Sequence, residues 1–234
     1  MDAKDTSSES ATASPEPKLS STGIAAMQGD GGDASAEKWH TGRPAELAAI
    51  ESLRADEGRC MDLNSTRQGG SPNFPIYDVA GPGTVASVKH LGQDDGGQLL
   101  EGALAQYRSA FREAIGNGTD PTKFEKAAEE LSRLSEEGKP VPIELRDKPL
   151  EYLRGHAQLW VPADHAYQVK DDLSRRLLSD DPVTREVTAS QYNLNHNSEN
   201  YSQNVADLLN RVKPLPKTSS ELKDEFSRGA PRGL

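Results

Sequence analysis

The fold is decided by two short apolar runs, Pro75-Ile76-Tyr77-Asp78-Val79 and Val85-Ala86-Ser87-Val88-Lys89. The segment between them, Ala80-Gly81-Pro82-Gly83, has the Gly and Pro content of a tight turn. The pattern predicts two strands of a hairpin, the first ending near the Asp78 carboxylate and the second ending at the Lys89 ammonium. An acid and an amine at these positions are expected to meet at one edge of a sheet.

Helical patterns surround the hairpin. Pro44 suits the first turn of a helix and Gly58 suits its end, so residues 44–57 are predicted to be helical, with Leu47, Ile50 and Leu53 as the apolar stripe. The other predicted elements are helices at about 99–115, 120–137, 143–153 with an interruption at Pro149, 162–178 and 202–212, and a short strand at 159–161. We therefore expect an α/β fold in which helices flank a small mixed β-sheet, with a helical C-terminal region.

The composition divides the chain of 234 residues into three parts. Residues 1–38 are rich in Ser, Ala, Gly, Asp and Glu, and such a segment buries too little apolar surface to offset the entropy lost on ordering. We expect a disordered leader or linker at 1–38, one domain at 39–213 and a flexible tail at 214–234. No run is long and apolar enough for a membrane helix, and no N-terminal signal peptide is recognisable.

Charge and cysteine content exclude some classes of protein. The net charge is −10, and even the most basic stretch, residues 182–234, has only seven Lys and Arg against six Asp and Glu. This lack of basic excess is unusual for a nucleic-acid binder. The single Cys60 excludes an internal disulfide and a multi-cysteine zinc site, and we interpret it as a small buried residue.

Three residues form the candidate reactive set. On a helical wheel Glu46 lies within the apolar stripe of the predicted helix 44–57, where an unpaired carboxylate is costly. Carboxylates such as Glu46 and Asp78 are ligands for hard divalent cations, and Lys89 would orient water or neutralise developing charge on a phosphate. The alternative is a surface hairpin that carries one acid and one base and has no chemistry. His156 and His165 are interpreted as ordinary histidines, because no helix fixes their spacing.

The ordered set Thr41-Gly42-Arg43-Pro44-Ala45-Glu46, Asn73-Phe74-Pro75-Ile76-Tyr77-Asp78 and Val85-Ala86-Ser87-Val88-Lys89 resembles the PD-(D/E)xK, restriction-endonuclease-like fold. It is most similar to the nuclease toxin domains of contact-dependent-inhibition and Rhs-type effectors. The resemblance covers residues 41–91 and implies Glu46 and Asp78 as ligands of Mg²⁺ or Mn²⁺ and Lys89 as the catalytic lysine.

The sequence departs from the family pattern at two places. Ser87 stands where the wider fold has Asp or Glu, and His90-Leu91-Gly92 replaces the Thr-Leu-Asp that often follows the lysine; Asp94, Asp95 or Glu101 could supply the missing carboxylate. Ser87, Gln68 and His90 are the expected substrate contacts. The implied substrate is nucleic acid, with DNA preferred here over transfer RNA, and the implied partner is a cognate immunity protein.

A toxin of this kind is a secreted effector that acts in the cytoplasm of a target cell. The alternative function is a non-enzymatic acidic binding module, such as an immunity or adaptor protein, because such proteins mimic the charge of nucleic acid.

Overall fold

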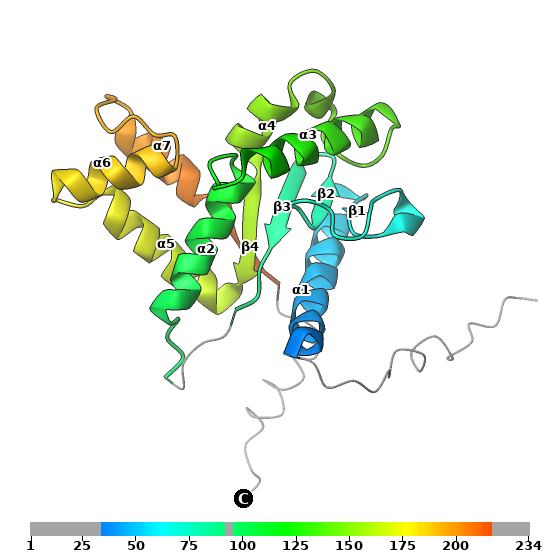
Figure 1. Ribbon diagram of the computed structural model, residues 1–234, viewed down its shortest axis with the longest axis horizontal. Helices are drawn as coiled ribbons and strands as arrows, with labels where there is room; N and C mark the ends of the chain where they lie inside the picture. Colours follow the sequence, from blue (N-terminus) through cyan, green and yellow to red (C-terminus); the bar gives the residue numbers. More distant parts are fainter. Residues whose placement is uncertain (1–33, 92–95, 217–234) are drawn as a thin grey trace, which may run out of the picture.

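The computed structural model describes residues 34–91 and 96–216, and its centre is a five-stranded mixed sheet (Figure 1). The strands lie in chain order: β1 (Met61–Asp62), β2 (Val79–Gly81), β3 (Thr84–Val88), β4 (Gln158–Pro162) and β5 (Val212–Leu215). The pairs β1–β2 and β2–β3 are antiparallel, whereas the pairs β3–β4 and β4–β5 are parallel. The expected α/β class with a small mixed sheet flanked by helices is confirmed.

The hairpin forms, but its first strand begins later than the sequence predicts. Asp78 directly precedes β2 instead of ending a strand, and Val79 is the register partner of Ala86. The chain before Asp78 is irregular, because Asn73 and Ile76 both have positive φ angles. The turn after β2 is held by Glu57, whose carboxylate accepts hydrogen bonds from Gly83 N and Thr84 Oγ1.

Helix α1 (Ala34–Glu57) covers one face of the sheet (Figure 1). Its small and apolar residues pack against Val79, Ala86, Val88 and Trp160, with Ala45, Ala49, Ile50 and Leu53 as the buried members. The prediction that this helix begins at Pro44 is wrong, since α1 starts ten residues earlier and holds Pro44 inside it. Leu47 does not belong to the buried stripe, because it is 46% exposed. Ala45 and Ala49 set the buried face instead.

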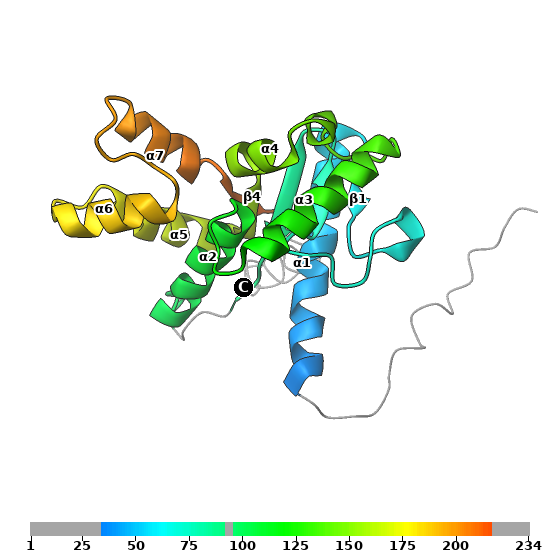
Figure 2. The same ribbon diagram turned by 45° about the horizontal axis from the view of Figure 1, so that its top comes forward.

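The opposite face is covered by the helices of two long crossovers. Between β3 and β4 lie α2 (Glu101–Ala114), α3 (Pro121–Glu136), η3 (Ile143–Arg146) and α4 (Pro149–His156). Between β4 and β5 lie α5 (Ala163–Leu177), α6 (Pro182–Gln191) and α7 (Tyr201–Leu209). Two apolar clusters result: one joins α2, α5 and α7 to β4 and β5, and the other joins α3 and α4 to the hairpin. Figure 2 shows α6 and α7 beyond α5, far from α1.

The remaining differences from the predicted elements concern short or polar segments. Helix α6 lies within 182–201, where the polar and Asn-rich sequence predicts no helix; Asp181 caps it by accepting from Val183 N and Thr184 N. The expected tail 214–234 loses its first two residues to β5, which pairs with β4 through Pro214 and Leu215. The expected leader falls mostly on residues 1–33, outside the described residues, but its last part, 34–38, is helical.

Candidate active site at the edge of the sheet

Asp78 lies at the mouth of the hairpin and is tied to β3. Its Oδ2 accepts a hydrogen bond of 2.7 Å from Val88 N, and Lys89 Nζ is 3.8 Å from the same oxygen. Asn64 Nδ2 lies 3.4 Å from Oδ1. Burial raises the pKa of Asp78, and the Lys89 charge and the Val88 hydrogen bond only partly oppose this effect. The structure therefore brings together the acid and the amine that the hairpin pattern singles out.

Lys89 is placed by the pairing of β3 with β4. Its backbone N–H donates to Trp160 O over 2.9 Å, so the ladder continues one residue past the end of β3. Its side chain is partly exposed, and its ammonium is reachable from solvent beside Asp78. Ser87 is two residues earlier and is only 1% exposed. The hydroxyl expected to contact substrate is thus buried in the sheet.

Glu46 reaches the same region from α1, together with a carboxylate that the sequence analysis does not identify. Arg43 Nη1 is 2.7 Å from Glu46 Oε2, and Arg43 Nη2 is 2.5 Å from Asp62 Oδ2. Asp62 belongs to β1 and its side chain is 5% exposed. Burial raises the pKa of Glu46 despite its hydrogen bond with Arg43, and the charges of Asp78 and Asp62 raise it further. Glu46 therefore lies within electrostatic reach of both other acids.

The loop after β1 fixes Asp62. Gln68, in η2 (Thr66–Gln68), accepts a 3.0 Å hydrogen bond from Asp62 N through Oε1, and Asn64 N donates to Asp62 Oδ1 over 3.1 Å. Asn64 also accepts from Phe74 N through Oδ1 at 2.9 Å, which joins this loop to the segment before Asp78. Gln68, expected as a substrate contact, holds the backbone of Asp62 in this structure.

His90 is exposed and its ring centroid is 6.3 Å from that of His165. His165 is buried, and its Nδ1 is 2.7 Å from the hydroxyl of Tyr107, which accepts from Leu91 N over 3.1 Å. Burial lowers the pKa of His165, which favours the neutral ring. This buried pair anchors the chain directly after Lys89 and His90. It is a packing feature that the irregular spacing of His156 and His165 does not reveal.

The chemistry of these donors fits a hard divalent cation, because Glu46, Asp62 and Asp78 all offer carboxylate oxygens. In the arrangement seen here, no group of three or more His, Cys, Asp or Glu side chains among residues 43–91 and 96–216 is gathered closely enough to hold a metal ion. The guanidinium of Arg43 lies between two of the three acids. Of the residues expected to compensate for Ser87, Glu101 pairs with Arg108 and Arg176, and Asp94 and Asp95 lie outside the described residues.

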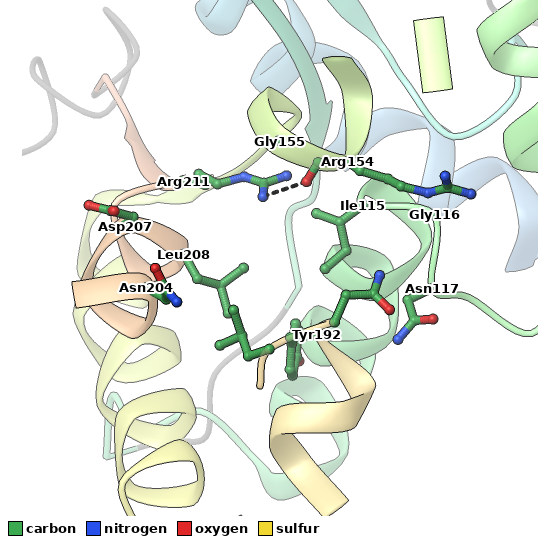
Figure 3. Close-up of a pocket in the computed structure, with 12 residues that line it drawn as sticks. Ile115, Gly116, Asn117, Arg154, Gly155, Tyr192, Asn204, Asp207, Leu208 and Arg211 are labelled. Atoms are coloured by element: carbon green, nitrogen blue, oxygen red, sulfur yellow. Dashed lines mark hydrogen bonds between the residues drawn. The ribbon is translucent and has the colours of Figure 1, made fainter. Parts of the chain in front are cut away.

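A pocket of about 710 Å³ lies elsewhere, between the end of α2, the end of α4 and α7 (Figure 3). Arg154, Tyr192, Asn204 and Asp207 are among the residues that line it. Arg211 also borders it, but its guanidinium is committed to the backbone carbonyls that end α4. The described lining contains no His, Cys, Ser or Lys, and the edge formed by Asp78 and Lys89 is therefore the better candidate for catalysis.

Comparisons with protein-family models, curated proteins and solved structures give no match for this chain. Among the described helices, none has both the length and the apolar character needed to span a bilayer.

Proposed function

We propose that the chain is a metal-dependent nuclease of the toxin type, with a restriction-endonuclease-like fold. The observation that carries the proposal is the contact between Asp78 and Lys89 at the mouth of the hairpin, with Glu46 and Asp62 beside it. The mixed sheet with helices on both faces is also what the resemblance over residues 41–91 implies. That resemblance remains the reason for choosing phosphodiester hydrolysis over other metal-assisted reactions.

The residues have separate roles in this proposal. Glu46 and Asp78 would hold Mg²⁺ or Mn²⁺, which when bound polarises the phosphate and lowers the pKa of water. Lys89 would donate to a phosphate oxygen or orient water, since its side chain is partly exposed and its ammonium lies 3.8 Å from Asp78 Oδ2. The exposed His90 extends the same edge and would contact the neighbouring part of the substrate.

Cleavage assays test this proposal. Purified chain is incubated with plasmid DNA and with total RNA, with Mg²⁺ or with excess chelator. We expect cleavage that requires the metal and that falls by at least about 100-fold in Asp78→Asn and in Lys89→Ala. Lys148→Ala is the matched control, because the side chain of this lysine is 70% exposed and pairs with Glu151 on α4. Full activity of Asp78→Asn and Lys89→Ala would contradict the assignment.

Toxicity in cells supplies a second test of the same function. If the chain is an effector that acts in the cytoplasm of a target cell, its expression should arrest growth unless an immunity protein is co-expressed. Lys89→Ala should be tolerated without that partner. The cleavage assay tests the expected preference for DNA by comparing plasmid DNA with total RNA. Transfer RNA is the next substrate to test.

The net charge of −10 favours a second candidate, an acidic binding module such as an immunity or adaptor protein. Metal titration separates the two. A nuclease site should give a Mn²⁺-dependent rise in melting temperature that Asp78→Asn removes, whereas a binding module should give no such rise.

A further inference from the structure

The hydroxyl of Tyr107 lies where α2, α5 and the chain after β3 meet. Tyr107, on α2, is fully buried, with 0% of its surface exposed. Its oxygen accepts a hydrogen bond from Leu91 N over 3.1 Å and lies 2.7 Å from Nδ1 of His165, in the first turn of α5. The segment that carries Lys89 is therefore tied to two helices through one buried hydroxyl.

The protonation of His165 decides which way this hydroxyl points. Burial lowers the pKa of His165, and the nearby charge of Asp164 only partly opposes this effect, so the neutral ring is favoured. A neutral ring can accept the phenol proton at Nδ1, and we assign the proton in this way. Tyr107 then donates to His165 and accepts from Leu91 N, so that both capacities of its hydroxyl are used.

Lys89 itself is held by few contacts. Its N–H donates to Trp160 O over 2.9 Å, and its ammonium is 3.8 Å from Asp78 Oδ2, a distance at which an ion pair holds a long side chain only weakly. Leu91 packs against the apolar cluster of α2, α5 and α7, but an apolar contact has no preferred direction. The hydrogen bond from Leu91 N to Tyr107 therefore sets the direction of the backbone after Lys89.

We propose that Tyr107 and His165 are positioning residues for Lys89, because the Tyr107 hydroxyl holds Leu91 N and His165 holds that hydroxyl. This inference rests on the proposed nuclease function. Both side chains are buried, so they would act on the reaction through the backbone of Lys89 and not by touching the substrate. A shift of this backbone would move the ammonium out of reach of the phosphate or water and would slow the chemical step.

Tyr107→Phe tests the proposal, since it removes the hydroxyl and keeps the ring. In cleavage of plasmid DNA with Mg²⁺, kcat should fall by about tenfold while KM stays unchanged. Backbone amide exchange, followed by NMR, should become at least about tenfold faster at Leu91 and at least about threefold faster at Lys89. Unchanged exchange at both amides, or an unchanged kcat, would overturn the proposal.

Tyr201→Phe is the matched control. Tyr201, on α7, belongs to the same apolar cluster, and its hydroxyl donates to Leu177 O over 2.8 Å, outside the candidate site. This variant also loses one buried hydrogen bond, but it should keep the kcat and the Lys89 and Leu91 exchange rates of the wild type. An equal fall in kcat would attribute the effect of Tyr107→Phe to lost stability and would overturn the proposal.

Two substitutions of His165 test its part in the arrangement. Asn places a side-chain oxygen where Nδ1 of the ring lies and can still accept from Tyr107, whereas Leu fills similar space and cannot accept. His165→Asn should keep kcat within about threefold of the wild type, and His165→Leu should lower it by about tenfold. Equal kcat values for the two variants would overturn the role of His165.

The two readouts separate this inference from the proposed function. If the wild type cleaves neither plasmid DNA nor total RNA, the proposed function fails, and amide exchange at Lys89 alone decides whether Tyr107 holds the backbone of the lysine. If the wild type cleaves and Tyr107→Phe matches it in both kcat and exchange, only this inference fails.

Discussion

At the scale of single residues, Asp78 is held where its ionisation is costly. Burial is the main cause that raises its pKa above the usual value of 3.8, and Lys89 compensates only in part. Val88 N and Asn64 Nδ2 donate to the carboxylate and hold it in that position. An acid kept in such a place is typical of sites where charge is used in function.

Because ionisation of the buried Asp78 carboxyl destabilises the folded state, we predict that Asp78→Asn gains stability relative to the wild type as pH rises. A folded-state pKa above the unfolded one gives stability that is present below pH 3.8 and is lost as pH rises through the folded-state pKa. The amide does not ionise, so the difference in the free energy of unfolding between Asp78→Asn and wild type should move in favour of the variant as pH rises from 4 to 8. Urea unfolding across this range measures the difference.

Asp120 provides an opposite control for this measurement. It caps α3 and accepts from Thr122, and the hydrogen bond from the Thr122 side chain is the main cause that lowers its pKa. Its stabilising effect is present above the unfolded-state pKa and is lost at acid pH. The same difference for Asp120→Asn should therefore move against the variant as pH rises. If the stability differences of the two variants changed with pH in the same direction, the proposed destabilisation by the buried Asp78 charge would be contradicted.

At the scale of elements, Arg211 joins α4 to the start of β5. Its guanidinium donates to Ala157 O at 2.9 Å and Arg154 O at 2.8 Å, and its Nη2 lies 3.4 Å from Leu153 O. These carbonyls end a helix of only eight residues, which has little stability of its own. Burial lowers the pKa of Arg211 to about 10. A buried cation here is balanced by carbonyl dipoles at a helix C-terminus.

Arg211→Met should therefore reduce the free energy of unfolding by about 2–4 kcal/mol, because the carbonyls of the buried Leu153 and Ala157 and of the exposed Arg154 lose a charged donor. The substitution keeps an apolar stem over the Phe111 ring, where the guanidinium carbon is 5.8 Å from the centroid. Arg175→Met is the control, since Arg175 is exposed and pairs with Asp171 on its own helix. Chemical denaturation measures the free energy of unfolding of both variants. An equal decrease in the two would argue against stabilisation of the α4 C-terminus by Arg211.

The elements also show which features the sequence predicts and which it does not. Helices α2, α3 and α5 carry strong apolar periodicity, and their predicted ranges lie within two residues of the observed ones. The hairpin is predicted by its turn residues, and with it Asp78 and Lys89. Strand β1 has two residues, too few for any alternation, and the role of its Asp62 depends on a contact with α1 that no local pattern contains.

The same reasoning explains the substrate contacts that the fold does not support. The motif places Ser87 among the substrate contacts, but β3 has a neighbouring strand on each side and Ser87 is buried there. Gln68 lies in a loop whose composition predicts exposure, yet its side chain holds β1 in place. Met61 and Leu63 are apolar and lie on either side of Asp62, but this local pattern does not indicate the contact of Asp62 with Arg43 on α1.

At the scale of the whole molecule, the sheet depends on a strand near the C-terminal end. Strand β5 is parallel to β4 over Val212–Leu215, and its Val212 belongs to the cluster that joins the sheet to α2, α5 and α7. Pairing of this kind is non-local, because α5, α6 and α7 separate the two strands in the chain. The edge strand opposite β1 is therefore β5, which is also the last strand in the sequence.

Two truncations test this dependence. A chain that ends at Pro216 retains all five strands and should unfold cooperatively, as the full chain does. A chain that ends at Arg211 loses β5 and exposes the β4 edge, and it should be unfolded or aggregated. Circular dichroism and size-exclusion chromatography compare the two, and cooperative unfolding of the shorter chain would show that β5 is dispensable.

The hydrogen bonds of Glu57 to the hairpin turn fix the position of α1 relative to the candidate site. Glu57, the last residue of α1, is hydrogen-bonded to Gly83 and Thr84. The eleven helical positions from Glu57 back to Glu46 therefore determine where along the helix axis, and in which direction from it, the Glu46 side chain lies. One residue inserted between them would rotate Glu46 by about 100° and raise it by about 1.5 Å. The length of this helix is thus as much a part of the site as the acids themselves.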